Sequence, residues 1–369
     1  MVDIYSPDKL LYHLGKLDTL KQNKKITPNL IELHLEAYCN DNCVFCSFRK
    51  DNGTNRNMLK LIDGESSNEN KPIGRPSDKS RIPFDVVMKL PKMMKECNIP
   101  ACLFSGGGEP TIYPKFDEVL DEFIKHGIEL ALITNGTNLS ESRINKIVDN
   151  FIWIRFSMDG SKQESHKLIH KTPNDDFERR VESIKKICSL KKQRNKDLTV
   201  GISFIITKDN IGDIEDSAKF YHGMGVDNIR FSYMFDESGN GGLTNSEIES
   251  VKERLSKLKD TYGEFIQGNK DRIDLYSKPN DDFSTCYIQH FNWVIGADSM
   301  VYPCCIMTYH PSFVLADISK EKLTDIVNSD KVHQKMIKLN PKSCLPCWLR
   351  PKNQLVETIF KEPNHKNYC

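Results

Sequence analysis

Three cysteines stand close together near the beginning of the chain, at Cys39, Cys43 and Cys46. With three and then two residues between them, their thiolates can converge on one face of a tight loop, which suits a soft metal centre better than disulfides. Three ligands are one fewer than a closed four-cysteine cluster site uses, so a [4Fe–4S] cluster here would keep one iron open to a further ligand. The spacing therefore favours a catalytic cluster, with a zinc site as the alternative.

A second group of cysteines lies far downstream, at Cys286, Cys304, Cys344 and Cys347. A Cys-x-x-Cys pair joined by two distant cysteines can form a closed four-thiolate site for zinc or for an iron–sulfur cluster. The chain holds twelve cysteines, and in the reducing compartment that we expect for it, metal binding accounts for so many better than disulfides do.

Five cysteines fall outside these two groups. Cys97, Cys102 and Cys188 lie on the apolar faces of predicted elements, so we expect them in the core as small apolar residues. Cys305 is adjacent to a predicted ligand and should lie near the second metal site. Cys369 is the final residue and could supply an extra ligand, but a free surface thiol is the favoured interpretation.

Glycine and small polar residues follow three successive predicted strands. The segments are Ser105-Gly106-Gly107-Gly108-Glu109-Pro110, Thr134-Asn135-Gly136 and Ser157-Met158-Asp159-Gly160. A glycine run lets the backbone approach a ligand closely and offers exposed N–H and C=O groups to a charged amino acid moiety. Each segment alone is typical of a turn, but their repetition on successive strand ends favours a shared binding site.

The elements that must position these residues follow a regular pattern. Apolar runs typical of strands occur at 30–35, 101–104, 128–133, 151–158, 198–206 and 228–233, and amphipathic helices alternate with them. The last helix of the series is opened by the capping box Thr244-Asn245-Ser246-Glu247. Six strands alternating with helices predict an α/β fold with a parallel sheet, a partial (β/α)6 TIM-like barrel. The working site of such a fold lies at the carboxyl ends of the strands, where the three-cysteine loop is expected.

The remaining segments suggest three parts. Residues 1–28 form an extension with a short amphipathic helix over 8–20, residues 29–265 the barrel, and residues 266–369 a small cysteine-rich module. This module has short strand-like runs at 272–276, 291–295 and 300–302 and one helix over 323–336, with too little apolar sequence for an independent core, so we expect a bound metal to hold it together. Residues 50–82 are polar and are interpreted as a surface loop, or alternatively as a lid over the site.

Together these motifs carry a family resemblance. The three-cysteine loop with aromatic Phe45 before its last cysteine, followed by the strand-end series, resembles the radical S-adenosylmethionine (radical SAM) superfamily. The resemblance implies a [4Fe–4S] cluster at Cys39, Cys43 and Cys46 whose open iron chelates the amino and carboxylate groups of S-adenosylmethionine. Reductive cleavage of S-adenosylmethionine would then release a 5′-deoxyadenosyl radical.

The resemblance also assigns cofactor contacts. The run Gly106, Gly107, Gly108 and Glu109 matches the family's Gly-Gly-Glu motif, which contacts the methionyl amino group. Asn135 belongs to a feature common in the family. Ser157 and Asp159 are expected to bind the ribose hydroxyls or the methionyl carboxylate. The adenine is expected against Phe45 and the backbone of the fifth and sixth strands, near Ile206 and Phe231.

The second cysteine group resembles the Twitch module, a shortened relative of the SPASM domain. The resemblance implies one auxiliary [4Fe–4S] cluster at Cys286, Cys304, Cys344 and Cys347. The longer pattern would add cysteines after Cys347, and the sequence Trp348-Leu349-Arg350-Pro351-Lys352-Asn353 holds none, so we expect no second auxiliary cluster. In radical epimerases of this family type a cysteine thiol returns a hydrogen atom to the substrate radical, and Cys305 is the candidate for that role.

Three functions remain open on the sequence. The first is dehydrogenation or epimerisation of a small polar substrate such as a sugar, an aminocyclitol or a nucleoside. The alternative is radical modification of a peptide or protein side chain. Because only about 28 residues precede the first strand, we expect no leader-binding domain, although stand-alone peptide epimerases lack one too. A non-enzymatic protein with two zinc sites is the third hypothesis, and it does not explain the strand-end series.

The amino-acid composition limits the kinds of partner that we expect the chain to bind. The chain has 52 lysines and arginines against 51 aspartates and glutamates, so we expect neither nucleic acid nor a membrane surface as a partner. No segment has the length or apolarity of a membrane span or a signal peptide, which predicts a cytoplasmic protein. The radical chemistry implies a reducing electron donor such as flavodoxin or ferredoxin.

Overall fold

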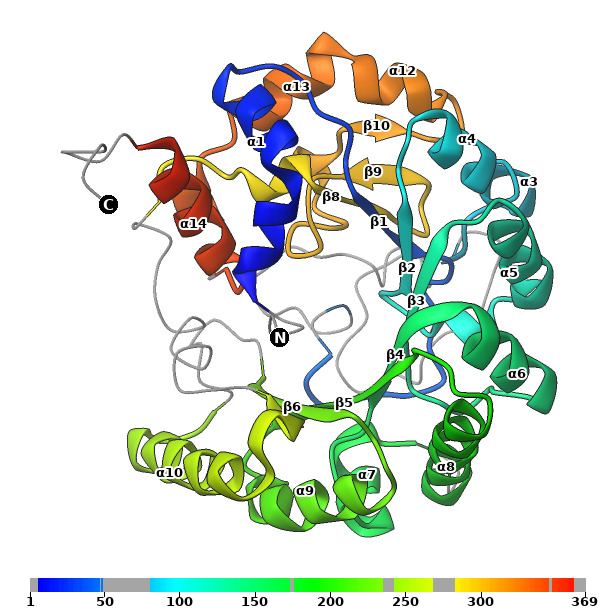
Figure 1. The fold of residues 1–369 in the computed structure, drawn as a ribbon, viewed down its shortest axis with the longest axis vertical. Helices are drawn as coiled ribbons and strands as arrows, with labels where there is room; N and C mark the ends of the chain where they lie inside the picture. The colour runs from blue at the N-terminus through cyan, green and yellow to red at the C-terminus, as the bar shows by residue number, and fades with distance from the viewer. Residues whose placement is uncertain are drawn as a thin grey trace.

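A computed structural model describes residues 6–46, 48, 80–172, 176–234, 242–267, 283–344 and 347–361. In Figure 1 the strands form an inner wall with helices around its outer side, and the C-terminal segment lies beside the N-terminal one. The predicted strand at 272–276, Cys369 and nearly all of the predicted loop at 50–82 lie outside the described residues.

One sheet of ten strands runs through the described part of the chain, in the order β10-β9-β8-β1-β2-β3-β4-β5-β6-β7. All neighbouring pairs from β8 to β7 are parallel, whereas β9 and β10 are antiparallel to their neighbours. Within the described residues the sheet ends at β7 on one side and at β10 on the other, and the predicted partial barrel is confirmed. The strands are β1 (Leu30–His34), β2 (Ala101–Ser105), β3 (Glu129–Thr134), β4 (Phe151–Ser157), β5 (Thr199–Ile206), β6 (Asn228–Tyr233), β7 (Ile266–Gln267), β8 (Asn292–Ile295), β9 (Met300–Tyr302) and β10 (Ala316–Asp317).

Helices cover the outer face of the barrel strands, as Figure 1 shows. The barrel helices are α3 (Phe84–Val87), α4 (Leu90–Glu96), α5 (Phe116–Lys125), α6 (Glu141–Asn150), α7 (Gln163–His170), α8 (Phe177–Gln193), α9 (Ile214–Gly223) and α10 (Asn245–Tyr262). The short 3-10 helices are η1 (Pro7–His13), η3 (Pro110–Ile112), η4 (Ile211–Asp213), η5 (Gly263–Phe265), η6 (Ile288–His290), η7 (Pro311–Phe313) and η8 (Pro341–Ser343).

Local sequence explains where these helices lie and begin. In α5 the apolar residues Phe116, Val119, Leu120 and Phe123 recur at helical spacing and are all fully buried in the main core. The predicted capping box of α10 is confirmed, since Thr244 and Glu247 exchange side-chain and backbone hydrogen bonds at its start. No helix in the described ranges is both long and apolar enough to cross a membrane.

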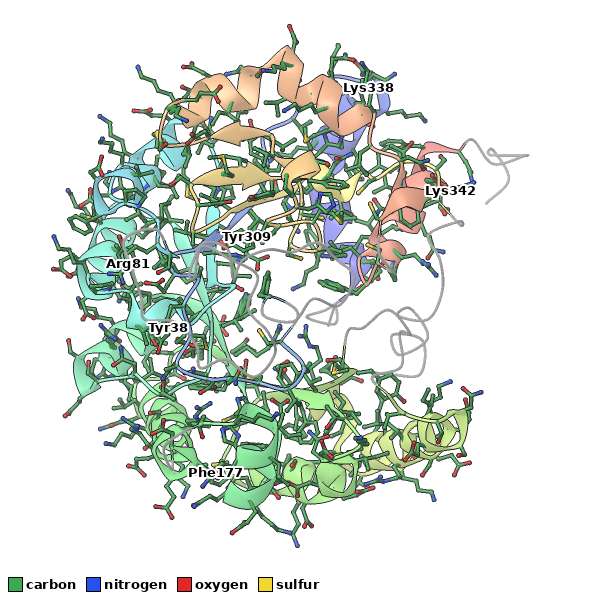
Figure 2. All side chains as sticks on the ribbon, turned by 180° about the vertical axis from the view of Figure 1, so that it is seen from behind. Tyr38, Arg81, Phe177, Tyr309, Lys338 and Lys342 are labelled. Atoms are coloured by element: carbon green, nitrogen blue, oxygen red, sulfur yellow. The ribbon has the colours of Figure 1, made fainter. Side chains whose placement is uncertain are left out.

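The C-terminal module continues the barrel sheet. Its strand β8 pairs in parallel with β1, from Leu30 opposite Asn292 to Leu33 opposite Ile295. A hydrogen bond of 3.1 Å joins His34 Nδ1 to the hydroxyl of Tyr309, which also accepts the N–H of Ala297. Figure 2 shows Tyr309 toward the centre of the molecule, whereas Phe177 lies among the outer helices. The module is therefore integrated with the barrel through its backbone and its side chains.

Two details differ from the sequence expectations. The helix predicted over 323–336 is two helices, α12 (Leu323–Asn328) and α13 (Asp330–Ile337), because Ser329 between them is extended and caps α13. The N-terminal helix α1 (Leu14–Lys21) packs with η1 on the module's helix α14 (Arg350–Phe360) in a small apolar cluster separate from the main core. The division at residues 28 and 265 stays a prediction.

Candidate active site

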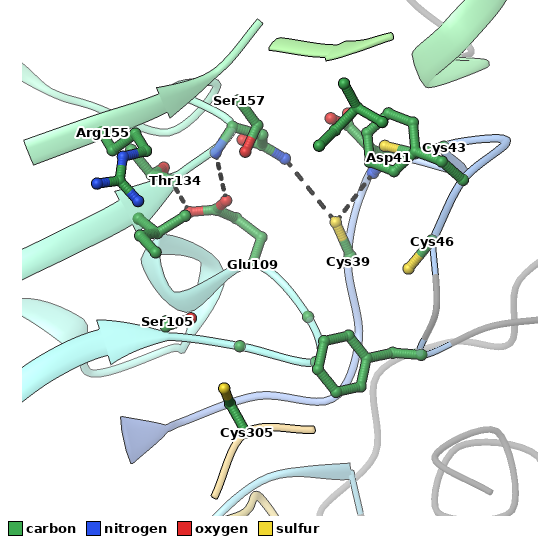
Figure 3. A pocket seen from close by; sticks show the side chains of 18 of the residues that line it. Cys39, Asp41, Cys43, Cys46, Ser105, Glu109, Thr134, Arg155, Ser157 and Cys305 are labelled. Carbon is green, nitrogen blue, oxygen red and sulfur yellow. Dashed lines mark hydrogen bonds between the residues drawn. The ribbon is translucent and has the colours of Figure 1, made fainter. Parts of the chain in front are cut away.

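A cavity of about 450 Å³ lies at the carboxyl ends of the barrel strands. It brings together most of the predicted site residues from separate strands, and Figure 3 shows many of them around one space. The predicted residues that line it are Cys39, Cys43, Phe45, Cys46, Gly106, Gly107, Gly108, Glu109, Asn135, Ser157 and Cys305.

The three-cysteine loop follows β1 and is held in place by the end of α7. The N–H of Asn42 donates to the carbonyl of His170, and the N–H of Val44 donates to the carbonyl of Ile169, each at 2.9 Å. The sulfur of Cys39 accepts the backbone N–H of Asp41 at 3.4 Å. Three sulfurs on one loop, with a backbone N–H donating to that of Cys39, fit the three-ligand cluster that the spacing predicts.

A buried charged network lies beneath this loop. Arg180 of α8 forms a two-pronged ion pair with Asp41, with nitrogen–oxygen distances of 2.6 and 2.9 Å. His170 Nδ1 lies 3.0 Å from Asp41 Oδ2 and 3.4 Å from the sulfur of Cys43. His170 Nε2 lies 2.7 Å from Asp159 Oδ2, as an ion pair rather than as an aligned hydrogen bond. These charged side chains are all at most 1 % exposed.

The pKa shifts in the network follow from its charges. Burial raises the pKa of Asp41, but hydrogen bonds from His170 and Arg180 outweigh burial and hold that pKa below its usual value. Burial lowers the pKa of His170, but the charge of Cys43 and the contacts with Asp159 and Asp41 outweigh it and raise the pKa well above its usual value. The sequence analysis identified neither Asp41 nor His170 nor Arg180 as a site residue.

The glycine run after β2 packs against residues 36–38, which lead into the cysteine loop. The N–H of Gly108 donates to the carbonyl of Glu36, and a Cβ on Gly108 would lie 1.9 Å from the carbonyl oxygen of Tyr38. Glycine is therefore required here for the contact between two backbone segments. Gly106 is also constrained, because a Cβ there would lie 2.5 Å from the carbonyl oxygen of Gly108. This physical role adds to the predicted contact with a ligand.

Glu109 braces two strand ends. Its carboxylate accepts the backbone N–H and the hydroxyl of Thr111, the hydroxyl of Thr134 and the N–H of Asn135, at 2.6 to 3.0 Å. Burial raises the pKa of Glu109 although these hydrogen bonds act in the opposite direction. Figure 3 shows the carboxylate of Glu109 turned toward Thr134. The contact with the methionyl amino group that the resemblance implies stays a prediction.

Asn135 connects the third strand to the cysteine loop. Its side-chain amide donates to Asn40 Oδ1 at 2.8 Å and approaches the sulfur of Cys39 at 3.9 Å. Its side-chain oxygen accepts the N–H and the hydroxyl of Thr137. Ser157, at the end of β4, also lines the cavity. Both residues are therefore positioned for the predicted cofactor contacts, which stay predictions.

Asp159 and Ile206 do not line the cavity. Asp159 is fully buried, because it pairs with His170 and accepts the backbone N–H of Ile205 at 2.5 Å. Ile206 points into the main core, and the alternation of side chains along β5 places Ile205 in the cavity instead. Phe231 is likewise a core residue. For Ile206 and Phe231 the expected contact is between adenine and the backbone, and it stays a prediction, as does the contact of Asp159 with the ribose hydroxyls or the methionyl carboxylate.

The second cysteine group surrounds a small cavity in the C-terminal module. Cys286, Cys304, Cys344 and Cys347 all line this space of about 30 Å³. Burial, followed by the charges of neighbouring cysteines in the group, raises the pKa values of Cys286 and Cys344 to about 12. Convergence of four thiols from distant segments fits a closed four-thiolate site and therefore an iron–sulfur cluster or zinc.

Cys304 and Cys305 face different spaces. Cys304 lines the small four-cysteine cavity, whereas Cys305 lines the large cavity at the strand ends. Figure 3 shows Cys305 on a separate segment from Cys39, Cys43 and Cys46. The thiol of Cys305 thus reaches the chamber where a substrate would lie while its neighbour belongs to the second metal site.

Several charged cavity residues were missing from the sequence expectations. Glu32 of β1, Arg155 of β4 and Arg230 of β6 line the cavity from inward-facing strand positions. Arg155 precedes Ser157 by two positions and therefore shares its face of the strand. In the sequence, each of these is a charged residue inside an otherwise apolar strand. That pattern could have identified the positions, but it does not assign them a role.

Comparisons with known proteins agree with this geometry. The Radical SAM superfamily matches residues 37–221, and the SPASM iron–sulfur cluster-binding domain matches residues 286–348. The chain is 21 % identical over 262 residues to the antilisterial bacteriocin subtilosin biosynthesis protein AlbA of Bacillus subtilis, covering 70 % of this chain and 56 % of that protein.

A second curated relative comes from Pyrococcus furiosus. The chain is 27 % identical over 149 residues to its tungsten-containing aldehyde ferredoxin oxidoreductase cofactor-modifying protein, covering 39 % of this chain and 41 % of that protein. The chain thus spans about half the length of these curated relatives.

Solved structures share the fold. Streptococcus suis SuiB bound to precursor peptide SuiA has a TM-score of 0.63 at 15 % identity, covering 97 % of this chain and 79 % of SuiB. Native anSMEcpe with bound S-adenosylmethionine has a TM-score of 0.59 at 20 % identity, covering 88 % of this chain and 89 % of that one. This chain therefore belongs to the radical SAM superfamily and is a SPASM-type member, with a [4Fe–4S] cluster that binds S-adenosylmethionine and an auxiliary iron–sulfur cluster.

Proposed function

We propose that this chain modifies a residue of a peptide or protein substrate by abstracting a hydrogen atom from it. Support comes from relatives whose names concern peptides: AlbA takes part in the biosynthesis of a bacteriocin, and SuiB was solved with a precursor peptide. The sequence analysis placed a sugar, aminocyclitol or nucleoside first. The comparisons favour its alternative, the peptide substrate, so we give the peptide priority.

Different sides of the cavity would bind the cofactor and the substrate. When bound, the cluster and S-adenosylmethionine supply a 5′-deoxyadenosyl radical that removes a hydrogen atom from the substrate. Cys39, Cys43 and Cys46 would hold the cluster. Asn135 and Ser157 would orient S-adenosylmethionine at the adjacent strand ends. The substrate would occupy the rest of the chamber, with walls from the inner faces of the strands and from the C-terminal module.

We propose Cys305 as the hydrogen-atom donor, which makes the reaction an epimerisation. Abstraction breaks a substrate C–H bond and leaves a carbon radical and 5′-deoxyadenosine. The S–H bond of Cys305 then breaks as a new C–H bond forms on the other face of that carbon, leaving a thiyl radical. One electron and one proton restore the thiol, and a flavodoxin or ferredoxin is the proposed electron donor. The single observation that carries this role is the position of Cys305 in the cavity.

Deuterium incorporation tests the proposal. Anaerobically reconstituted wild-type enzyme, dithionite and S-adenosylmethionine would be incubated in deuterated water with peptides encoded beside the gene. A thiol exchanges its hydrogen with the solvent. We therefore expect a peptide product in which one residue has the D configuration and carries one deuterium at its α-carbon, with no other change in composition. Cys305→Ala should still form 5′-deoxyadenosine but lose the D-residue at least tenfold, since the carbon radical has no hydrogen source.

The matched control is Cys188→Ala, a buried cysteine of α8 away from the cavity, which should behave as wild type. A peptide product that is two electrons more oxidised would refute epimerisation while supporting the peptide substrate. Reaction with sugars, aminocyclitols or nucleosides but with no peptide would refute the peptide proposal itself.

A further inference from the structure

The cysteine loop contacts a chain of buried charges that connects two parts of the barrel. The chain begins at the sulfur of Cys43, passes through His170 and Asp159, and ends at the backbone N–H of Ile205. Ile205 lines the same cavity as Cys43. The imidazole of His170 therefore links Cys43, a predicted cluster ligand, to Ile205 of β5, which lines the cavity.

Both nitrogens of this imidazole face acceptors. Nδ1 faces Asp41 Oδ2 at 3.0 Å and Cys43 Sγ at 3.4 Å, while Nε2 faces Asp159 Oδ2 at 2.7 Å. An Nδ1 without hydrogen would oppose its lone pair to the carboxylate of Asp41, so Nδ1 carries hydrogen. His170 therefore donates from Nδ1 to the carboxylate of Asp41 and to the sulfur of Cys43.

Arg180 fixes the position of Asp41 relative to His170. Its guanidinium binds both carboxylate oxygens of Asp41, so that Asp41 is fixed beside His170. The same two-pronged pair argues against a separate metal ion held by Asp41, Cys43 and His170, although their ligand atoms lie within 4.8 Å of one another. The carboxylate is already neutralised by a cation that belongs to the chain.

We propose that His170, clamped by Asp41 and Arg180, is a positioning residue that tunes the S-adenosylmethionine-binding cluster through its hydrogen bond to Cys43. Hydrogen bonds to ligand sulfurs and nearby positive charge stabilise the reduced form of an iron–sulfur cluster. The network should therefore make the cluster easier to reduce and keep Cys43 in its liganding position. This proposal rests on the cluster and is independent of which substrate the enzyme accepts.

Two substitutions of His170 separate the hydrogen bond to Cys43 from the contact with Asp159. The amide nitrogen of asparagine occupies the place of Nδ1, so His170→Asn keeps a neutral donor toward Cys43. The amide nitrogen of glutamine occupies the place of Nε2, so His170→Gln keeps the contact with Asp159 and loses the donor. We expect the midpoint potential of His170→Asn to stay near that of wild type and that of His170→Gln to fall.

The measurement is a redox titration followed by EPR, using the signal that changes when S-adenosylmethionine is added. At an applied potential where wild type is half reduced, His170→Gln should show a roughly tenfold smaller ratio of reduced to oxidised cluster, equivalent to ~59 mV for one electron. Iron and sulfide contents, measured on the same samples, report assembly separately. His126→Asn, on a partly exposed histidine at the end of α5, is the matched control.

The outcomes separate tuning from simple support of the fold. Equal midpoint potentials in wild type, His170→Asn and His170→Gln, with full iron in each, would overturn the proposal. Loss of iron while the apo-protein keeps its circular dichroism and thermal unfolding would support the positioning of Cys43. If His170→Gln does not fold, Arg180→Lys replaces it: this variant keeps the charge but loses the two-pronged pair, and wild-type iron content and potential there would refute the clamp.

Discussion

At the scale of single residues, the site depends on contacts that tolerate almost no added volume. Gly108 is the clearest case, because its N–H binds the carbonyl of Glu36 while the next N–H, of Glu109, binds the carbonyl of Tyr38. These two hydrogen bonds join the glycine run to the segment that leads into the cysteine loop. The backbone on both sides is fixed, so a side chain at residue 108 cannot be accommodated by rotation of a neighbour.

Gly108→Ala should therefore damage the site by overpacking. Its Cβ would lie 1.9 Å from a backbone oxygen of Tyr38, and the segments must separate to relieve this contact. We expect a loss of about 1–3 kcal/mol in the free energy of unfolding and weaker S-adenosylmethionine binding. Thermal denaturation and equilibrium dialysis with the cofactor measure the two effects. Gly223→Ala, where a Cβ meets no atom within 4 Å, is the control, and equal losses in both variants would contradict the steric argument.

At the scale of elements, two helices hold the segments that carry predicted metal ligands. The last carbonyls of α7 accept N–H groups of the cysteine loop, and in the C-terminal module a side chain of α14 holds the segment before Cys286. There Glu357 accepts the N–H groups of Ser284 and Thr285 and the hydroxyl of Ser284, which fixes the segment before Cys286. Both metal loops are thus positioned by a helix distant in the sequence.

Glu357 predicts a pH dependence. Burial raises its pKa, but the hydrogen bonds from Ser284 outweigh burial, so the pKa in the folded chain is lower than usual. A carboxyl group with a lowered pKa stabilises the fold above its ordinary pKa of about 4.3, and this stabilisation is lost as pH falls through the lowered value. The difference in thermal unfolding temperature between wild type and Glu357→Gln should therefore be largest near neutral pH and shrink below about pH 4.

The measurement is thermal unfolding of both proteins, without metal, from pH 3 to 7. Glu249→Gln, at an exposed glutamate of α10, controls for the general effect of removing a negative charge. If the difference between wild type and Glu357→Gln grew toward low pH instead, the lowered pKa of Glu357 in the folded chain would be wrong.

At the scale of the whole molecule, one continuous sheet carries both cysteine sites. The barrel strand β1 leads into the first site, and its parallel neighbour β8 belongs to the module that holds the second. Consecutive residues Cys304 and Cys305 then connect the second site to the cavity. The two clusters are therefore held by a common framework, although each has its own set of ligands.

Separate ligand sets predict that one cluster can be removed without the other. With two [4Fe–4S] clusters, reconstituted wild type should contain about eight iron and eight sulfide per chain, and Cys344→Ala about four of each. The remaining cluster should still cleave S-adenosylmethionine to 5′-deoxyadenosine. Iron and sulfide assays with quantification of 5′-deoxyadenosine check this expectation. A Cys344→Ala protein with the full iron content would show that the second group is not a four-cysteine cluster site.

The sequence by itself determined the fold class, the two cysteine sets and most of the cavity-lining motifs. Ligand spacing, strand periodicity and glycine runs are local properties, and parallel strands bring their carboxyl ends to one place. Only the tertiary structure decided which side chains of β5 face inward, so that Ile205 rather than Ile206 lines the cavity. It alone also decided that Asp159 is buried. It also decided the network beneath the cysteine loop, because Asp41 meets His170 and Arg180 across 129 and 139 residues of sequence. Such pairs depend on how α7 and α8 pack on the barrel, and no local pattern encodes that distance.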